Sequence, residues 1–298
     1  MTGVQTCALP ISKRALYIVI ISGAINLLLN LFFVCVLGMQ AGGVALATVI
    51  SKCFTAVCIL HILRNEPDKT RIFISRIKIY KEPFLQILRL GIPSGIQSSV
   101  YSISNMVVQS SINSFGSAAI AGNSASTSIT NFYSMLGSSM YQSSLIFTSQ
   151  NYGAKKFDRI KRVLGICLFY CLCFWLIHSA VTFFAGKALL GLYAPNAPVV
   201  VEYGWRKLSI VGYAYGLLFI MNTMSGVLRG MGASLGNMIT SILGACGIRI
   251  LWILTAFKAI GTFESLFYCY PLSWLGTFCM HFIMFIFVFR KARRANQN

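Results

Sequence analysis

Long apolar runs separated by short polar segments form the dominant pattern along this chain. Each run is about 20 residues or longer, which is the length that a helix needs to cross a bilayer. The runs do not alternate apolar and polar residues with a period of two, so they are not strands of a membrane barrel. The pattern predicts an all-α polytopic membrane protein with eight transmembrane helices. The predicted spans are residues 15–37, 43–63, 91–114, 118–146, 164–185, 206–228, 235–256 and 266–289.

The longest polar segment, residues 64–89, leaves two predicted spans before it and six after it. Many transporters consist of two related repeats, so this unequal division favours a symmetric 6+6 protein that has lost its first four helices. The chain is then expected to contain the last two helices of one lobe, a cytoplasmic inter-lobe loop, a complete six-helix lobe and a basic cytoplasmic tail. These parts are residues 13–63, 64–83, 84–290 and 291–298, respectively.

The first residues read MTGVQTCALPIS and have neither the basic start nor the apolar stretch of a signal peptide. Residues 1–11 match the translation of a common sequencing-library adapter. We therefore expect residues 1–12 to be an artefactual and poorly packed tail, and the native sequence to enter near Lys13.

Composition and charge agree with a membrane protein. The chain is 56% hydrophobic and only 10% charged, whereas about 25% of the residues of soluble proteins are charged. The net charge of +19 would favour nucleic-acid binding in a soluble protein, but its distribution predicts orientation instead. Of the 25 Lys and Arg residues, 19 fall on one set of loops and ends, and four fall on the other, namely Lys187, Arg206, Lys207 and Lys258.

Because basic loops stay in the cytoplasm, this distribution predicts a multi-pass protein of the cell (inner or plasma) membrane with both ends cytoplasmic. The expected partner of the basic residues is therefore the lipid bilayer and not nucleic acid.

The ten cysteines and three histidines form no recognisable metal or catalytic site. No C-x-x-C pair occurs, and no His or carboxylate lies at metal-ligand spacing. Cys167, Cys171 and Cys173 cluster in one apolar run, where the ordinary role of cysteine is packing. We therefore expect no metal, no catalytic residue and no enzymatic activity.

Polar residues recur about every four positions in the 91–114 and 118–146 spans, which places them on one face of each helix. They are Gln97, Tyr101, Asn105 and Gln109 in the first span, and Asn123, Thr127, Asn131, Ser134, Ser138 and Gln142 in the second. Polar faces are costly against lipid, so they line a cavity or bond to neighbouring helices. Both alternatives stay open for Ser and Thr. The amides favour a cavity, because an amide needs several hydrogen-bond partners.

In the 206–228 span, Tyr215, Phe219 and Asn222 share a face. With Met221 and Met224 they form either ordinary core or the wall of a site for bulky, partly apolar solutes, since Met and aromatic side chains adapt to varied shapes. The predicted substrate-binding residues are Gln97, Tyr101, Asn105, Asn131, Tyr215 and Asn222.

LGIPSGIQ opens the third predicted span, SQNYGAKKFDRIKR follows the fourth, and VLRGMG follows the sixth; NLLLNLFFV and GGVALATVIS lie in the first two. In this order and spacing, the motifs resemble those of the MATE (multidrug and toxic compound extrusion) family. The resemblance runs from about residue 15 to 290 and implies helices five to twelve of a fold with two six-helix lobes. It also implies export of small organic, drug-like molecules by cation antiport, with Na⁺ or H⁺ as coupling ion and no cofactor. The fragment itself is expected to be monomeric and inactive.

The resemblance further implies a cation site in the first two spans. Some members bind the coupling cation with an Asn and an Asp on the fifth helix and a Thr on the sixth, positions that fall on Asn26, Asn30 and Thr48 here. Asn30 departs from the pattern, since a neutral amide can bind Na⁺ through its oxygen but cannot carry a proton. Lys52, one turn after Thr48, would repel a cation if it faced the site. Other members have a coupling carboxylate in the C-terminal lobe, and no midspan carboxylate occurs there in this sequence.

Arg249 lies within the 235–256 span. It could extend to the outer surface and pair with Glu202 or Glu264, or it could face a cavity and favour anionic solutes. Two alternative functions also stay open. A lipid-linked oligosaccharide flippase of the same superfamily would require a strongly cationic cavity, for which Arg249 and Lys52 are the only candidates. A membrane-embedded transferase would require converging catalytic carboxylates or histidines, which the sequence does not supply.

Overall fold

The computed structural model describes residues 2–65, 73 and 78–295, with side chains for 14–65, 73 and 78–294. Within these ranges every regular element is a helix. The chain divides into two compact units, Met1–Tyr80 and Lys81–Asn298. The predicted inter-lobe loop, residues 64–83, lies partly outside the described residues.

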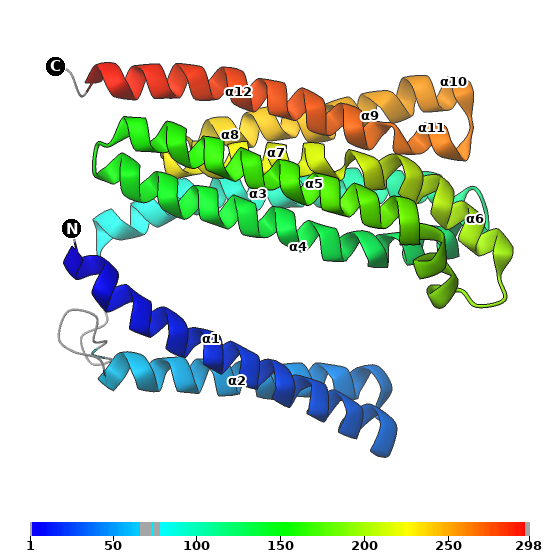
Figure 1. Ribbon diagram of the computed structural model, residues 1–298, viewed down its shortest axis with the longest axis horizontal. Coiled ribbons are helices and arrows are strands. Elements are labelled where there is room, and N and C mark those ends of the chain that lie inside the picture. Colours follow the sequence, from blue (N-terminus) through cyan, green and yellow to red (C-terminus); the bar gives the residue numbers. More distant parts are fainter. Residues whose placement is uncertain (1, 66–72, 74–77, 296–298) are drawn as a thin grey trace. The chain divides into compact units, whose positions relative to one another are not determined.

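The first unit is an antiparallel helical hairpin (Figure 1). Helix α1 (Thr2–Leu31) continues into a wider π-type turn, η1 (Phe32–Val36), and helix α2 (Gln40–Asn65) returns alongside it. Gly38 makes the reversal possible, because its φ of +64° is readily adopted only without a Cβ atom. Helix α1 begins at Thr2, so the backbone of residues 2–12 is helical; that residues 1–12 are an artefactual tail stays a prediction.

The second unit is a bundle of long helical rods that lie side by side (Figure 1). Its first three rods are single helices, α3 (Lys81–Asn113), α4 (Ser117–Gly153) and α5 (Phe157–Tyr193). The next rod joins α6 (Pro198–Lys207), the π-type turn η3 (Leu208–Gly212) and α7 (Tyr213–Gly230). The following rod contains α8 (Ser234–Ser241), η4 (Ile242–Gly247), α9 (Ile248–Trp252), η5 (Ile253–Phe257) and α10 (Lys258–Ile260). The last rod consists of α11 (Phe263–Phe267) and α12 (Cys269–Ala295).

Six helical stretches of the described chain are long and apolar enough to cross a membrane. They are Arg14–Val36, Gln40–Asn65, Phe157–Tyr193, Pro198–Gly230, Ser234–Ile260 and Phe263–Arg294. The predicted spans 91–114 and 118–146 lie in α3 and α4, which are 33 and 37 residues long but are not among the six. The predicted count of eight is therefore not confirmed. The physical reason is the polar face of each helix, which lowers the average hydropathy although Ile103 and Phe132 are exposed on other faces.

Helix α4 packs along α7 at backbone distance. The α7 sequence Gly226–Val–Leu–Arg–Gly230 has two glycines four residues apart, an arrangement that lets two membrane helices approach closely. A Cβ atom at Gly226 would overlap the side chain of Ser144 and the backbone of α4, and one at Gly230 would lie 2.8 Å from the Cβ of Thr148. This contact holds together the two helices whose polar faces form the site described next.

Candidate substrate-binding site

Two of the cavities among the described residues of the second unit are lined by polar side chains that face one another. The Arg229 cavity, of about 300 Å³, is lined by Gln97, Tyr101, Ser138, Tyr141, Leu218, Met221, Asn222, Ser225, Arg229, Ser241 and His281. The Lys207 cavity, of about 320 Å³, is lined by Asn105, Val108, Gln109, Ile112, Asn123, Thr127, Thr130, Asn131, Lys207, Val211, Tyr215, Tyr270 and Trp274. Each cavity is at the lower end of the size range of sites for drug-sized molecules. Most side chains that line the Arg229 cavity are polar, whereas the Lys207 cavity combines polar with apolar and aromatic side chains.

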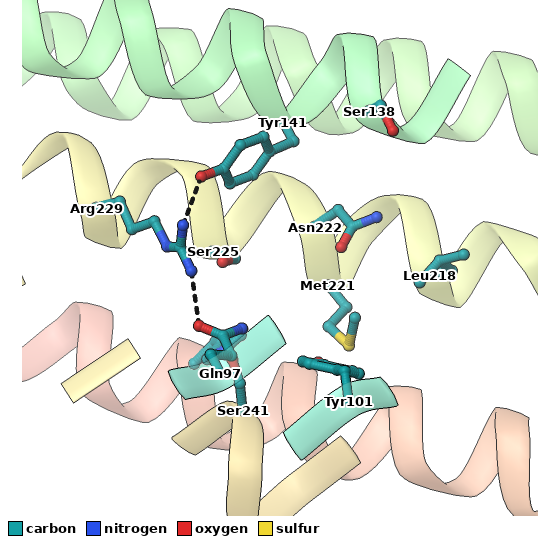
Figure 2. Close-up of a pocket in the computed structure, with 11 residues that line it drawn as sticks. Gln97, Tyr101, Ser138, Tyr141, Leu218, Met221, Asn222, Ser225, Arg229 and Ser241 are labelled. Carbon is teal, nitrogen blue, oxygen red and sulfur yellow. Dashed lines mark hydrogen bonds between the residues drawn. The ribbon is translucent and has the colours of Figure 1, made fainter. Parts of the chain in front are cut away.

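Arg229 lines the first cavity and bonds to two of its other lining residues (Figure 2). Its Nη2 donates to Oε1 of Gln97 at 2.6 Å, and its Nη1 donates to the hydroxyl of Tyr141 at 3.0 Å. The guanidinium also lies 5.8 Å from the ring centre of Tyr141. Both hydrogen-bond partners of this cation are thus neutral side chains, Gln97 of α3 and Tyr141 of α4. Arg229 of α7 therefore links three helices.

The opposite wall of the Arg229 cavity comes from α8 and α12. Ser241 and the buried His281 lie 3.1 Å apart, hydroxyl oxygen to ring Nε2. Tyr101 of α3 and Asn222 of α7 also line the cavity, and the amide of Asn222 has no hydrogen-bond partner among the described residues. Asn222 can therefore bond to a guest molecule without losing a contact within the protein.

Lys207 is the corresponding cation of the second cavity. Its Nζ donates to Oδ1 of Asn123 at 2.8 Å, to the hydroxyl of Thr127 at 2.6 Å and to the backbone carbonyl of Asn123 at 3.3 Å. The Nδ2 of Asn123 donates to Oε1 of Gln109 at 3.1 Å, and Nε2 of Gln109 donates to Oδ1 of Asn113 at 2.9 Å. An ammonium can only donate, so it determines the direction of every bond in this chain of amides.

Arg249 does not reach the surface glutamates, so the pairing with Glu202 or Glu264 that we considered is wrong. Both carboxylates bond to the exposed Arg206, each at 3.1 Å. Arg249 is only 3% exposed. Its Nη1 donates to Oδ1 of Asn105 at 2.8 Å, and its guanidinium lies 4.5 Å from the ring centre of Tyr270.

All six residues predicted to bind substrate line one of these cavities, but they do not form a single central site. Gln97, Tyr101 and Asn222 line the Arg229 cavity, whereas Asn105, Asn131 and Tyr215 line the Lys207 cavity. Phe219 and Met224, which we placed on the same wall, are buried in the hydrophobic core. Substrate binding at the six positions stays a prediction.

Two charged residues that line these cavities, Arg229 and Lys207, were not among the predicted site residues. The distribution of charge places Arg229, in the turn after the 206–228 span, among the 19 cytoplasmic Lys and Arg residues and Lys207 among the four on the other side, but the structure lines a cavity with each. The signal was present, because residues 207, 211, 215, 218, 222, 225 and 229 follow one another at steps of three or four and so share one face. His281, to which we assigned no chemistry, lines the Arg229 cavity as well.

The predicted cation-binding residues lie in the hairpin. Nδ2 of Asn26 donates to the hydroxyl of Ser51 at 2.9 Å, and Nδ2 of Asn30 donates to Oδ1 of Asn26 at 3.1 Å. Oδ1 of Asn30 is buried and has no hydrogen-bond partner among the described residues. Thr48 does not join this group, since its hydroxyl donates to the carbonyl of Val44 at 2.8 Å in its own helix.

Comparison with known proteins gives consistent matches. The family model described as MatE matches residues 93–255. The chain is 30% identical to the probable multidrug resistance protein YoeA of Bacillus subtilis (strain 168), covering 80% of this chain and 53% of that protein. It is 24% identical to the multidrug export protein MepA of Staphylococcus aureus (strain NCTC 8325 / PS 47), covering 82% of this chain and 54% of that protein. The chain thus spans about half the length of these relatives.

Among solved structures, a crystal structure of MATE in complex with MaL6 matches with a TM-score of 0.84 at 18% identity. The match covers 94% of this chain and 64% of the other. At this identity the likeness concerns the fold alone.

Proposed function

This chain belongs to the MATE family, and we propose that the protein is a secondary active exporter of small organic molecules. MATE relatives are multidrug efflux transporters of the membrane and not enzymes. The names of YoeA and MepA favour export over the flippase and transferase alternatives. The observation that carries the proposal is the pair of cavities that the polar and aromatic faces of α3, α4 and α7 enclose within one six-helix unit.

In this proposal, export depends on the rocking of two lobes around a shared binding region. The cavities would supply one wall of that region, with amide groups to orient a solute and aromatic rings to hold its apolar body. The 298-residue chain by itself is proposed not to transport. Uptake of a cationic dye into proteoliposomes that contain only this chain, under an imposed Na⁺ or H⁺ gradient, would contradict that statement.

The proposed coupling is cation antiport, with Na⁺ as the ion that suits the hairpin. Carbonyl and hydroxyl oxygens are the ligands that hard cations prefer, and the unpaired Oδ1 of Asn30 is such an oxygen. Neither Asn26 nor Asn30 can carry a proton. Lys52 is exposed, while the neighbouring Ser51 is buried and bonds to Asn26.

We also propose that both chain ends face the cytoplasm, on the basis of the Lys and Arg distribution. A single cysteine placed at Gly261, on a background without other reactive cysteines, should be labelled by an impermeant reagent from outside intact cells. A cysteine at Lys291 should not be labelled, and the reverse pattern would contradict this orientation.

The direct test of export uses a full-length parent expressed in cells that lack their own efflux pumps. Asn222→Ala should raise intracellular dye severalfold, because it removes an unpaired amide from the wall of the Arg229 cavity. Gln97→Ala should have a similar effect. Ser98→Ala is the matched control, since Ser98 is exposed on the same helix and bonds only to the carbonyl of Ser94, at 3.0 Å. Equal export by all three variants, at equal protein levels, would show that the cavity wall does not bind substrate.

The coupling proposal is tested by the Na⁺ dependence of export. Asn30→Ala should raise the Na⁺ concentration for half-maximal export about tenfold, because one oxygen ligand is lost. Asn65→Ala is the control, since Asn65 contacts His61 at the other end of α2. Export driven equally well by Na⁺ in both variants would exclude the Asn26–Asn30 site.

A further inference from the structure

The interior of the second unit contains more positive than negative charge. Residues 81–298 include four acidic side chains, those of Glu82, Asp158, Glu202 and Glu264. Glu202 and Glu264 both pair with Arg206, whose side chain is 44% exposed. Lys207 is the next residue, is only 6% exposed, and has no carboxylate partner among the described residues. The two neighbouring cations thus have opposite environments: one is neutralised at the surface, and the other is buried and uncompensated.

A second buried cation approaches the same cavity. Arg249 is 3% exposed, and its Nε has no hydrogen-bond partner in the described structure. Asn105 and Tyr270, which both contact Arg249, line the Lys207 cavity. An isolated charge in a low-dielectric interior is unfavourable unless an opposite charge compensates it.

The hydrogen-bond directions make the Lys207 cavity a donor-rich site. Arg249 and Lys207 occupy the oxygens of Asn105 and Asn123, so both amides must turn their NH₂ groups away from these cations. The NH₂ group of Asn123 is taken by Gln109, whereas that of Asn105 is free to donate at the cavity wall. The 3.3 Å bond from Lys207 to a backbone carbonyl is the longest of its three, and an anionic oxygen could replace it.

Irregular backbone lies next to both cations. Lys207 is followed immediately by the π-type turn η3, and Arg249 lies in the short helix between η4 and η5. Single π-type turns inside α-helices are frequently found at functional sites. In this protein the π-type turns lie next to Lys207 and Arg249, the two buried cations.

The cavity also has apolar and aromatic side chains in its wall, next to the polar Thr130 and Asn131. Val108, Ile112, Val211, Tyr215 and Trp274 surround the polar end. The volume of about 320 Å³ suits a small molecule with one ring system and one charged group.

We propose that the Lys207 cavity binds small organic anions, with the anionic group on Lys207 and the amide of Asn105 and the apolar body against Tyr215 and Trp274. This inference rests on the proposed export function and adds to it a substrate class. It excludes organic cations from this cavity, because Lys207 and Arg249 would repel them.

The test compares two probes of the same shape and opposite charge, naphthoate and naphthylmethylammonium. Their binding to the purified 298-residue chain in a non-ionic detergent is measured by isothermal titration calorimetry, with empty micelles subtracted. Naphthoate should bind at least about tenfold more tightly than the ammonium probe. Lys207→Met should weaken naphthoate binding about tenfold, because the charged partner of a desolvated pair is lost. Lys207→Arg should retain most of the affinity.

Lys187→Met is the matched control, since Lys187 is exposed on α5 near the same end of the unit; it should bind naphthoate like the wild type. Lys207→Met removes an unfavourable buried charge but also three hydrogen bonds, to Asn123 and Thr127. The variant is expected to fold, and the thermal unfolding midpoint checks this. If Lys207→Met nevertheless fails to fold, Asn105→Ala provides the second test, with an expected loss of about threefold.

Equal binding of the two probes, or naphthoate binding that is unaffected by Lys207→Met, would overturn the proposal. Absence of naphthoate binding would overturn it as well. The export function would remain intact in each case if Asn222→Ala still impaired dye export, so failure of the two proposals can be told apart.

Discussion

The helical hairpin and the six-helix unit differ in how much of each helix is buried and in how far apart in sequence their hydrogen-bonded polar side chains lie. Of the 18 most apolar consecutive residues in the Arg14–Val36 stretch of the hairpin, 6% are buried. The corresponding share in the Pro198–Gly230 stretch of the larger unit is 61%. Two helices can hydrogen-bond to each other, but they cannot enclose a space. Six helices have an inside, where a polar group is removed from lipid and can be held for a ligand.

The hydrogen bonds of the two units reflect this difference. In the hairpin, Asn30 bonds to Asn26 within α1, four positions earlier, and Asn26 bonds to Ser51 of α2, 25 positions later. In the larger unit, Gln97 bonds to Arg229 across 132 positions of sequence, and Asn105 bonds to Arg249 across 144. Substitutions in the larger unit should therefore disturb more of the structure.

The largest difference is expected at glycines. Gly226→Leu should destabilise the six-helix unit by about 3 kcal/mol or more, because the new side chain would force α7 away from α4. Gly23→Leu in the hairpin should leave stability unchanged or slightly raised, since nothing lies within 4 Å of a Cβ atom there and Leu favours a helix over Gly. The thermal unfolding midpoint in detergent measures both. Similar midpoints for the two variants would refute backbone-distance packing of α4 and α7.

An intermediate effect is expected at Gln97. Gln97→Ala should cost about 1–3 kcal/mol, because the guanidinium of Arg229 loses the acceptor at 2.6 Å and keeps only Tyr141 as a side-chain hydrogen-bond partner among the described residues. Ser98→Ala, one position later, should change the unfolding free energy by less than about 0.5 kcal/mol. If Ser98→Ala lowered the unfolding free energy as much as Gln97→Ala, the loss would come from helix α3 itself and not from the hydrogen bond to Arg229.

A smaller loss of stability than at Gln97 is expected at Asn26 in the hairpin. Asn26→Ala removes one bond between α1 and α2 and should cost about 0.6 kcal/mol, the average for such bonds in membrane helices. Its unfolding midpoint should therefore lie between those of Ser98→Ala and Gln97→Ala. A loss larger than that of Gln97→Ala would mean that the hairpin depends on its polar contacts more than the six-helix unit does.

Much of the fold followed from local pattern. A run of about 20 apolar residues must be helical in lipid, since its backbone groups have no other hydrogen-bond partners. The spacing of Gln97, Tyr101 and Asn105 placed these residues on one face, and the structure lines cavities with all three. The same reasoning could not count the membrane crossings, because α3 and α4 combine a polar face with an apolar one and fall below the hydropathy of the other rods.

Sequence by itself determined the helices, their polar faces, the shortage of acidic residues and the family motifs, because each depends on composition or on a short helical repeat. Only the tertiary structure decided which cations are inside. Arg206 and Lys207 are adjacent and chemically similar, yet successive residues of a helix point about 100° apart. Packing against α4 directs Lys207 to Asn123, 84 positions earlier, while Arg206 stays at the surface with Glu202 and Glu264. Such a choice depends on contacts between distant segments, which no local pattern contains.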